Sequence, residues 1–486
     1  MFTPSLSTLP EELQVQILGC IYKYSLIDLR LVSHTFSRLI TSIVFRAIRV
    51  RAYKDEPQRF INIAMTPHLR CHVREVTCDT WTGSFPTEKR QELMDEFFEA
   101  IPSICVFPKL DTLNIRLERD DFHLYHSTQF RLLEMLFRCM EGAWKVHGYI
   151  GRYTTSPKVS GQQSKIGVSR PLKTLSISNL VDISAIKAML SFQSVMNSGA
   201  LKDLRISAAD LNTQNCCLDI HHDLLDTVLS PRIAGNLEVL SLFSSASWGW
   251  FPNVDFRLVG ANDLPNLKVL ALGQFEFSQW WQVEWIGSLR IEKLYLDDCT
   301  VLHSEWNRAT VEVSQEEAQR IKNHAWREDS TYHTHTRWYH IFKHWANTMP
   351  NLRVFKIGQG WGLDSGSAWK AIDPTYEGDF YEHVEEDHEA IFQPFHDTSH
   401  QHFECPLPCT TGTGIRRYGS EAIWDYGTVF QYIEYVEGRG YTYTDSPGDG
   451  KEFMNVSSWE KENDRKAFEE FLTVVETRRK EFVGEE

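Results

Sequence analysis

The stretch "LPNLKVLAL", residues 264–272, recurs almost unchanged as "MPNLRVFKI" at residues 349–357. Both follow an L-x-x-L-x-L pattern in which conservative apolar exchanges are allowed. Residues two apart in a β-strand lie on the same face, so the last two apolar positions of each kernel point together into a core. In a third copy, "NLEVLSLFS", these positions are Leu240 and Leu242, and Ser241 between them points to the other side. Each kernel predicts a short strand that is buried on one face.

The kernel recurs along most of the chain, which is the signature of a solenoid. Most first anchors follow one another at intervals of 24 to 36 residues, and two longer intervals predict a degenerate repeat or an insertion. "HVREVTCDT" and "VFRAIRVRA" are earlier copies. Segments from Phe130, His222 and Arg337 have helical apolar spacing and lie between kernels. The seven main anchors are Leu110, Leu172, Leu201, Leu237, Leu267, Ile291 and Leu352.

A strand followed by a helix, repeated, resembles the irregular leucine-rich repeats. The Asn or Cys position of the strict consensus is mostly missing, and Cys299 is its clearest survivor. The resemblance implies a solenoid of parallel strands and helices over residues 46–360, with a mobile Gly- and Ser-rich loop near 151–171. Such a solenoid offers a long concave surface that recognises other macromolecules. The alternative is a non-repetitive α/β protein with several parallel strands.

The region 361–486 departs from the repeat and predicts strands and a final helix. "TVFQYIEYVEGRGYTYTD", residues 428–445, has the pattern of strands joined by a Gly-rich turn. Ser457 and Glu460 form a capping-box motif at the start of the final helix. Its apolar stripe comprises Phe468, Phe471, Leu472 and Val475. We expect this region to cap the last repeat, because a solenoid needs its terminal core covered.

The segment "LSTLPEELQVQILGC", residues 6–20, predicts a helix at the start of the chain. Thr8 and Glu11 form a capping box, and Pro10 falls in the first turn, where its missing N–H costs nothing. Two more short helices follow, the second capped by Ser33. About 40 residues bury too little surface to be stable alone, so a spare apolar face must dock on the rest of the chain or on a partner.

"LPEELQVQIL" followed by "SLIDLRLVSHTFSRL" resembles the F-box, a helical motif that in its family binds the adaptor subunit of cullin-RING ubiquitin ligases. A Trp that often follows the second half appears here as Phe36. The resemblance covers residues 1–45 and predicts buried aliphatic anchors at the adaptor interface. The predicted adaptor-binding residues are Leu9, Pro10, Leu13, Ile17, Leu18, Leu29, Leu31, Val32 and Phe36. Alternatively, these helices are simply the first ones of a larger domain.

The overall expectation is an α/β protein with a three-helix F-box, an irregular leucine-rich-repeat solenoid and a C-terminal cap. The resemblance implies a non-catalytic substrate receptor of an SCF-type ligase, with a Skp-type adaptor, a cullin scaffold and an unknown protein target as partners. Such a receptor contributes proximity between target lysines and the ubiquitin thioester. An adaptor-binding scaffold without ubiquitination remains the first alternative.

The composition of the chain argues against several classes of function. A formal net charge of −15 argues against a general nucleic-acid binder, since Arg49, Arg51 and Lys54 form only a short basic cluster. We find no apolar run of bilayer-spanning length, and Glu11 and Glu12 interrupt any secretory leader, which favours a cytoplasmic or nuclear protein without membrane contact. The ten cysteines are scattered, which argues against a disulfide framework.

Metal and catalytic motifs are weak, and we expect no cofactor. "HDTSHQHFECPLPC", residues 396–409, offers five possible zinc ligands, which leaves a zinc-binding protein as the second alternative. His340 and His344 share a helical face, but Ile341 stands where a metalloprotease helix needs Glu. "SASWGWF" and "SQWWQVEW" could supply contact residues for a target, although most of their rings should be core. The possible zinc ligands are His396, His400, His402, Cys405 and Cys409.

Overall fold

The structure is a computed structural model of the 486-residue chain. It describes residues 9–21, 23–80, 82, 86–117, 122–142, 171–180, 186, 189–208, 229–249, 255–297, 299–306, 332–333, 336–358, 431–436, 440–443 and 458–484. By its internal contacts the chain divides into two compact units. Unit 1 comprises residues 1–178 and 185–201, and unit 2 comprises residues 179–184 and 202–486. Because this division cuts the repeat region itself, the predicted boundaries at 45/46 and 360/361 stay predictions.

Unit 1 begins with three helices, α1 (Glu11–Gly19), α2 (Lys23–Leu29) and α3 (His34–Val44). The Ser33 side chain accepts a hydrogen bond from the Phe36 N–H at 3.2 Å, as expected for the cap of α3. These helices share a core of their own, and half-buried side chains including Leu29 and Phe36 pack around it. The buried members of this core are Leu18, Leu26, Leu39, Ile40 and Val44.

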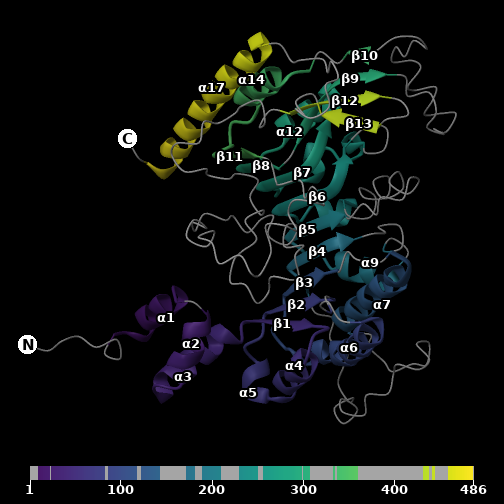
Figure 1. The fold of residues 1–486 in the computed structure, drawn as a ribbon. Helices are drawn as coiled ribbons and strands as arrows, with labels where there is room; N and C mark the ends of the chain where they lie inside the picture. Colours follow the sequence, from purple (N-terminus) through teal and green to yellow (C-terminus); the bar gives the residue numbers. More distant parts are fainter. Residues whose placement is uncertain are drawn as a thin grey trace, which may run out of the picture. The chain divides into compact units, whose positions relative to one another are not determined.

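The remainder of unit 1 alternates strands and helices. Strands β1 (Ala47–Arg51), β2 (Glu75–Asp79), β3 (Thr112–Arg116) and β4 (Thr174–Leu180) pair in parallel in sequence order. The helical segments are α4 (Glu56–Met65), α5 (Pro67–Arg70), α6 (Thr87–Ala100), the 3-10 helix η2 (Ile101–Val106), α7 (Phe122–Glu141) and α9 (Leu190–Met196). Helix α4 packs on β1 and α6, while α7 packs on η2 and α9 (Figure 1).

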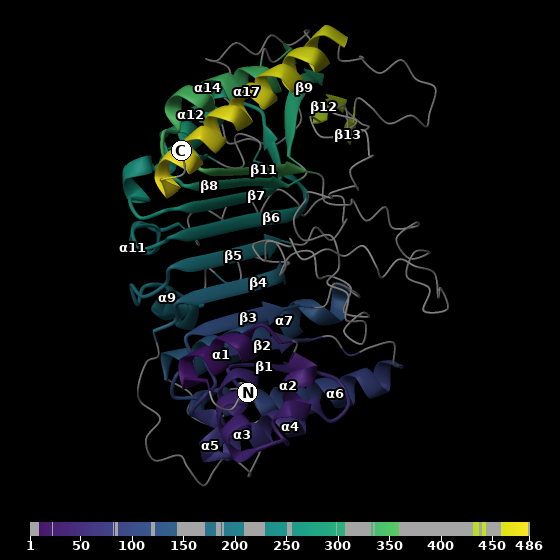
Figure 2. The same cartoon turned by 90° about the vertical axis from the view of Figure 1, so that its left-hand side faces the viewer.

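Unit 2 continues the same alternation. Strands β5 (Asp203–Ala208), β6 (Val239–Trp248), β7 (Val269–Phe277), β8 (Lys293–Asp297) and β11 (Val354–Gly358) pair in parallel in this order (Figure 2). The end of β7 also pairs in parallel with β9 (Thr300–Trp306). Strand β9 in turn pairs in parallel with β12 (Gln431–Val436) and in antiparallel fashion with β10 (Tyr332–His333). Strand β13 (Gly440–Tyr443) pairs with β12 in antiparallel fashion.

Short helices connect the strands of unit 2, and a long one closes it. They are α11 (Pro231–Ala234), the 3-10 helices η4 (Phe256–Leu258) and η5 (Ala261–Asp263), α12 (Trp280–Ser288), α14 (Trp338–Thr348) and α17 (Ser458–Val483). Helix α12 packs on β7 and α14. Helix α17 packs on α14 and β11 (Figure 1).

The α/β class with parallel strands is therefore correct. Each of the nine kernels, the two earlier copies included, overlaps one of the parallel strands β1–β8 and β11. All seven main anchors, and Val73 before β2, are at most 3% exposed. The predicted helices at Phe130 and Arg337 correspond to α7 and α14, whereas the segments from His222 and at 151–170 lie outside the described residues.

Helix α17 covers the apolar side of the last kernel, as its stripe predicts. Phe471 is 1% exposed, and its ring centroid lies 4.9 Å from that of Phe355 in β11. The carboxylate of Asp464 accepts a hydrogen bond from the Tyr339 N–H at 2.8 Å, at the start of α14. At the other end of α14, Arg478 donates to the carbonyls of Ala346 (2.6 Å) and Met349 (2.8 Å). Helix α17 thus caps both ends of α14, with the charges that the helix dipole favours.

Across the described segments, no helix combines the length and the apolar content needed to cross a lipid bilayer. The longest helix, α17, carries charged residues along much of its length and buries an apolar stripe against α14 and β11. The tryptophan-rich segments also contribute to the core. Trp248 is 2% and Trp285 7% exposed, although Trp280 remains 37% exposed.

Candidate partner-binding surface

Exposed apolar side chains concentrate in the first two helices and the turn that follows them. Of the fourteen exposed large hydrophobic side chains among the described residues, six lie between residues 13 and 32. Scattered surface apolar residues are ordinary, but a concentration of them in one short segment marks a partner-binding surface. The six are Leu13, Val15, Ile17, Ile27, Leu31 and Val32.

Helix α1 carries apolar side chains on its buried face and also on a neighbouring face that is exposed. Gln14 and Leu18, four residues apart, are the buried positions of α1. Leu13 and Ile17 form the neighbouring stripe and remain 45% and 40% exposed. Pro10, three residues before Leu13, is also exposed and continues this stripe toward the start of the helix. A helix that is apolar on two faces needs a second partner, because the core of α1–α3 covers only one of them.

The turn between α2 and α3 carries the most exposed aliphatic side chain in the described residues. Leu31 is 85% exposed and Val32 is 67% exposed. Their backbone N–H groups donate to the carbonyls of Asp28 (3.0 Å) and Leu29 (3.1 Å), so the turn itself is ordered by hydrogen bonds. An ordered turn holds the two side chains in place, which lowers the entropy cost of burying them against a partner.

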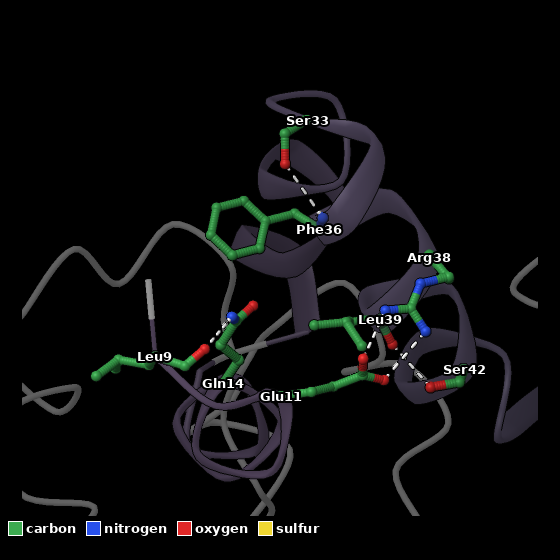
Figure 3. Close-up of polar contacts among 8 residues, drawn as sticks. All are labelled: Leu9, Glu11, Gln14, Ser33, Phe36, Arg38, Leu39 and Ser42. Atoms are coloured by element: carbon green, nitrogen blue, oxygen red, sulfur yellow. Dashed lines mark hydrogen bonds and ion pairs between the residues drawn. The ribbon is translucent and has the colours of Figure 1, made fainter. Parts of the chain in front are cut away.

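Polar contacts fix α1 against α3, as Figure 3 shows. The guanidinium of Arg38 donates to both carboxylate oxygens of Glu11, at 3.0 and 2.7 Å. This hydrogen bond lowers the pKa of Glu11 from its usual value. The amide of Gln14 donates to the carbonyl of Leu9 at 2.7 Å. These contacts hold the exposed stripe of α1 in a defined orientation.

The predicted start of α1 needs a correction. The helix begins at Glu11, so Pro10 occupies the N-cap position and not the first turn. The capping box of Thr8 and Glu11 stays a prediction, because Thr8 lies outside the described residues. The Glu11 carboxylate accepts charged hydrogen bonds from Arg38, which link the start of α1 to α3.

The structure places the predicted adaptor-binding residues in three environments. Pro10, Leu13, Ile17, Leu31 and Val32 are exposed. Leu9, Leu29 and Phe36 are half-buried, and the latter two pack on the helical core. Leu18 is 0% exposed and belongs to that core, which leaves it no surface to offer a partner.

Val15 and Ile27 are exposed side chains that the F-box pattern did not single out. Val15 is 38% and Ile27 46% exposed. The sequence carried a signal for Val15, because it lies two positions from both Leu13 and Ile17 and so off their helical stripe. An apolar residue that belongs to no stripe is a candidate for exposure.

The strands present a second surface on the face opposite the buried kernel positions. In unit 1 this face is polar, since Arg49, Thr77, Asn114 and Ser176 are successive neighbours across β1–β4. Burial, together with repulsion from the guanidinium of Arg51, lowers the pKa of Arg49 to about 10. Neighbouring Arg51 in turn donates to Glu56 at 3.0 and 2.5 Å.

In unit 2 the corresponding face carries a buried apolar cluster on β7 and β8. Ala271 and Tyr295 are buried there, and four half-buried side chains pack against them. The ring of Phe243 occupies the space where a Cβ on Gly273 would stand, so this position requires glycine. The packed side chains are Val239, Phe243, Val269 and Val354. At the strand position of Ala271, β5 carries Arg205 and β6 carries Ser241.

The histidine and cysteine motifs give no metal centre in the described part of the chain. No cluster of three or more potential ligands occurs among the described residues, and residues 396–409 lie outside them. His340 and His344 are half-exposed on α14 and pack against the rings of Tyr339 (4.1 Å) and Trp280 (5.2 Å). Buried Cys78 and Cys299 lie beside apolar neighbours, and burial raises the pKa of the Cys78 thiol.

Among the described residues, the exposed apolar positions therefore concentrate in the segment α1–α3. The strand face, in contrast, is half-buried at Arg49, Thr77 and Asn114 and buried at Ala271 and Tyr295. Aliphatic anchors on ordered backbone have the chemistry of macromolecular recognition. No protein-family model matches this chain, and a search of curated proteins finds no similar sequence.

Proposed function

We propose that this chain is the substrate-recognition subunit of an SCF-type cullin-RING ubiquitin ligase, in which residues 1–45 act as an F-box that binds a Skp-type adaptor. The observation that carries the proposal is the exposure of Leu13, Ile17, Leu31 and Val32. These four side chains occupy positions of the F-box pattern, and the core of α1–α3 does not bury them.

Burial of these side chains supplies enough free energy for a specific interface. Removing one exposed Leu, Ile or Val side chain from water stabilises a complex by about 1.5–3 kcal/mol. A handful of such anchors at the centre of an interface accounts for most of the affinity in typical complexes. The ion pair between Glu11 and Arg38 and the hydrogen-bonded turn before Ser33 reduce the ordering cost, because the anchors are already in place.

The strand faces are the proposed target-binding part, and the chain itself performs no bond-breaking step. Parallel strands with nearly identical kernels present one row of side chains per strand position, as leucine-rich repeats do. The half-buried polar side chains of unit 1, Arg49, Thr77 and Asn114, then contribute to selecting the target. The target's lysines gain effective concentration near the ubiquitin thioester through tethering.

The test is co-purification of the full chain with a Skp-type adaptor, comparing the parent with Leu13→Asp, Leu31→Asp and the double variant. Each aspartate places a charge in the proposed interface, and we expect a loss of affinity of roughly tenfold or more for each. Leu190→Asp and Leu258→Asp are matched controls, because these leucines are 79% and 72% exposed and lie elsewhere in the chain. Both controls should bind like the parent.

Circular dichroism and thermal unfolding show whether each variant is folded, which separates loss of the interface from loss of structure. The proposal fails if the parent does not bind the adaptor, or if the folded double variant binds as well as the controls. A parent that binds the adaptor but excludes the cullin would support the scaffold function instead. The addition of cullin to the purified adaptor complex distinguishes the two.

A further inference from the structure

The repeats are so similar in sequence that their apolar pattern does not distinguish one strand from another. The kernels before β7 and β11 differ little, and all of them present apolar residues at the same positions. A strand that paired with the wrong repeat would bury almost the same side chains, so the apolar pattern alone specifies strand order poorly. Some feature that differs between neighbouring repeats must favour the native order.

Such a feature lies at the residue directly after each first anchor. At this position in unit 2 the chain carries Lys202, Glu238, Lys268, Glu292 and Arg353, in the order in which β5, β6, β7, β8 and β11 pair. The charge alternates in sign at every step. We call these five residues the charge ladder.

Three of the four neighbouring pairs in the charge ladder are ion pairs. The Nζ atoms of Lys202 and Lys268 lie 2.5 and 2.8 Å from the two carboxylate oxygens of Glu238. Arg353 lies 3.5 Å from Glu292, and the charge of Glu292 helps to raise the pKa of Lys268. The backbone follows the same path, because the N–H of each member donates to the carbonyl of the member before it, at 2.7–2.9 Å.

Unit 1 repeats the arrangement by itself. Arg74, Asp111 and Lys173 occupy the equivalent position before β2, β3 and β4, and their charges also alternate. Lys173 lies 3.1 Å from Asp111, and its N–H donates to the Asp111 carbonyl at 2.8 Å. Arg46 holds this position before β1, where its carbonyl accepts from the Arg74 N–H at 2.8 Å, so the alternation covers β2–β4 and does not extend to β1.

We propose that the charge ladder disfavours pairings that skip a single repeat, because members that are two repeats apart carry the same charge. Skipping one repeat would bring Lys202 beside Lys268, or Glu238 beside Glu292, and such like-charge pairs are unfavourable. Each ion pair is partly exposed and contributes little by itself, but the alternating row penalises the wrong order at several positions together.

Glu238→Lys breaks the charge ladder at its centre, since it places three cations in a row. In the full chain we expect a Tm about 2–4 °C below the parent at low salt, and a lower yield of native chain after refolding from urea. Glu238→Gln removes the two attractions without adding repulsion and should have a smaller effect. Glu470→Lys, at an exposed position of α17, controls for the change in net charge.

The decisive variant is Lys202→Glu/Glu238→Lys/Lys268→Glu, which restores alternation among these three positions with every sign reversed. It should recover part of the loss in Tm and in refolding yield, because the carboxylate introduced at position 268 still neighbours Glu292. The addition of 0.5 M NaCl should reduce the difference between the single variant and the parent. The inference is overturned if the triple variant is no better than Glu238→Lys, or if Glu470→Lys loses as much. This remains decisive even if Glu238→Lys fails to fold.

Discussion

Helices α1 and α17 begin with similar sequence signals and end in different environments. Each carries the glutamate of a predicted capping box, Glu11 or Glu460, and each side chain pairs with a distant arginine, Arg38 in α3 or Arg337 directly before α14. The first pair is largely exposed, at 62% for Arg38 and 53% for Glu11, whereas the second is 13% and 19% exposed. The same local motif thus forms a surface contact in one unit and an interior contact in the other.

The apolar stripes of the two helices differ in the same way. Helix α17 buries Ala467, Phe471 and Val475 against its own unit. Helix α1 buries Leu18 but leaves Leu13 and Ile17 exposed. An amphipathic sequence therefore indicates that a helix has an apolar face to cover. Only the packing shows whether the chain itself covers that face.

The largest expected effect on the free energy of unfolding comes from the buried stripe of α17. Phe471→Ala removes a ring that stacks on Phe342 at 5.7 Å and meets Phe355 edge-on. We expect unit 2 to lose about 3–5 kcal/mol in free energy of unfolding, because a buried aromatic is lost and a cavity remains. Urea unfolding of the full chain, with the exposed Thr473→Ala as control, measures it. A loss below about 1 kcal/mol would contradict the role of α17 as an internal cap.

A smaller effect on stability should distinguish the buried side of α1, which contains Leu18, from its exposed stripe, which contains Leu13. Leu18→Ala should destabilise the three N-terminal helices by about 2–3 kcal/mol, near the lower end for buried leucine because their core is small. Leu13→Ala should leave their stability nearly unchanged while weakening adaptor binding. Hydrogen exchange of the α1–α3 amides reports the stability directly. Equal losses of protection in the two variants would show that Leu13 is also part of the core.

The next smaller effect on stability is expected at the capping contacts of α14. Asp464→Ala leaves the Tyr339 N–H without its carboxylate acceptor in a half-buried position, and we expect a loss of about 1–3 kcal/mol in free energy of unfolding. Glu11→Gln in the exposed pair should have a smaller effect that high salt removes. Chemical denaturation at two salt concentrations compares them. The contrast fails if the Glu11 variant loses as much as the Asp464 variant.

The smallest effect concerns pH. Hydrogen bonds from Lys202 and Lys268 lower the pKa of Glu238 to about 2, below its unfolded value of about 4.3. The stabilisation is present above the unfolded pKa and disappears as the pH falls through the folded pKa. The difference in Tm between the parent and Glu238→Gln should therefore shrink from pH 5 toward pH 2. A constant difference over this range would show that the carboxylate charge is not responsible.

Much of the fold was predictable because its signals are local. The spacing of Leu240 and Leu242, and the anchor two residues before each strand, required no knowledge of distant residues. The partners of Glu11 and Glu460 were less predictable, because each side chain pairs with an arginine far away in sequence. Which arginine lies close depends on how the helices pack, whereas the capping boxes with Thr8 and Ser457 stay predictions because these two residues lie outside the described part of the chain.

The candidate surface was predictable in part. The F-box pattern named Leu13, Ile17, Leu31 and Val32, which are exposed, but also Leu18, which fills the helical core. Residues 17 and 18 are adjacent and both aliphatic, so no periodicity separates the one that faces a partner from the one that faces the chain. The position of α3 decides between them.

The sequence by itself determined the repeated parallel strands, the helices between them and the amphipathic faces, because these depend on the order of apolar and polar residues over short spans. Tertiary structure alone decided which apolar faces are covered, which arginine binds each glutamate and how the charges of neighbouring repeats meet. Burial and ion pairing depend on neighbours that are close in space and distant in sequence, and only the folded chain brings them together.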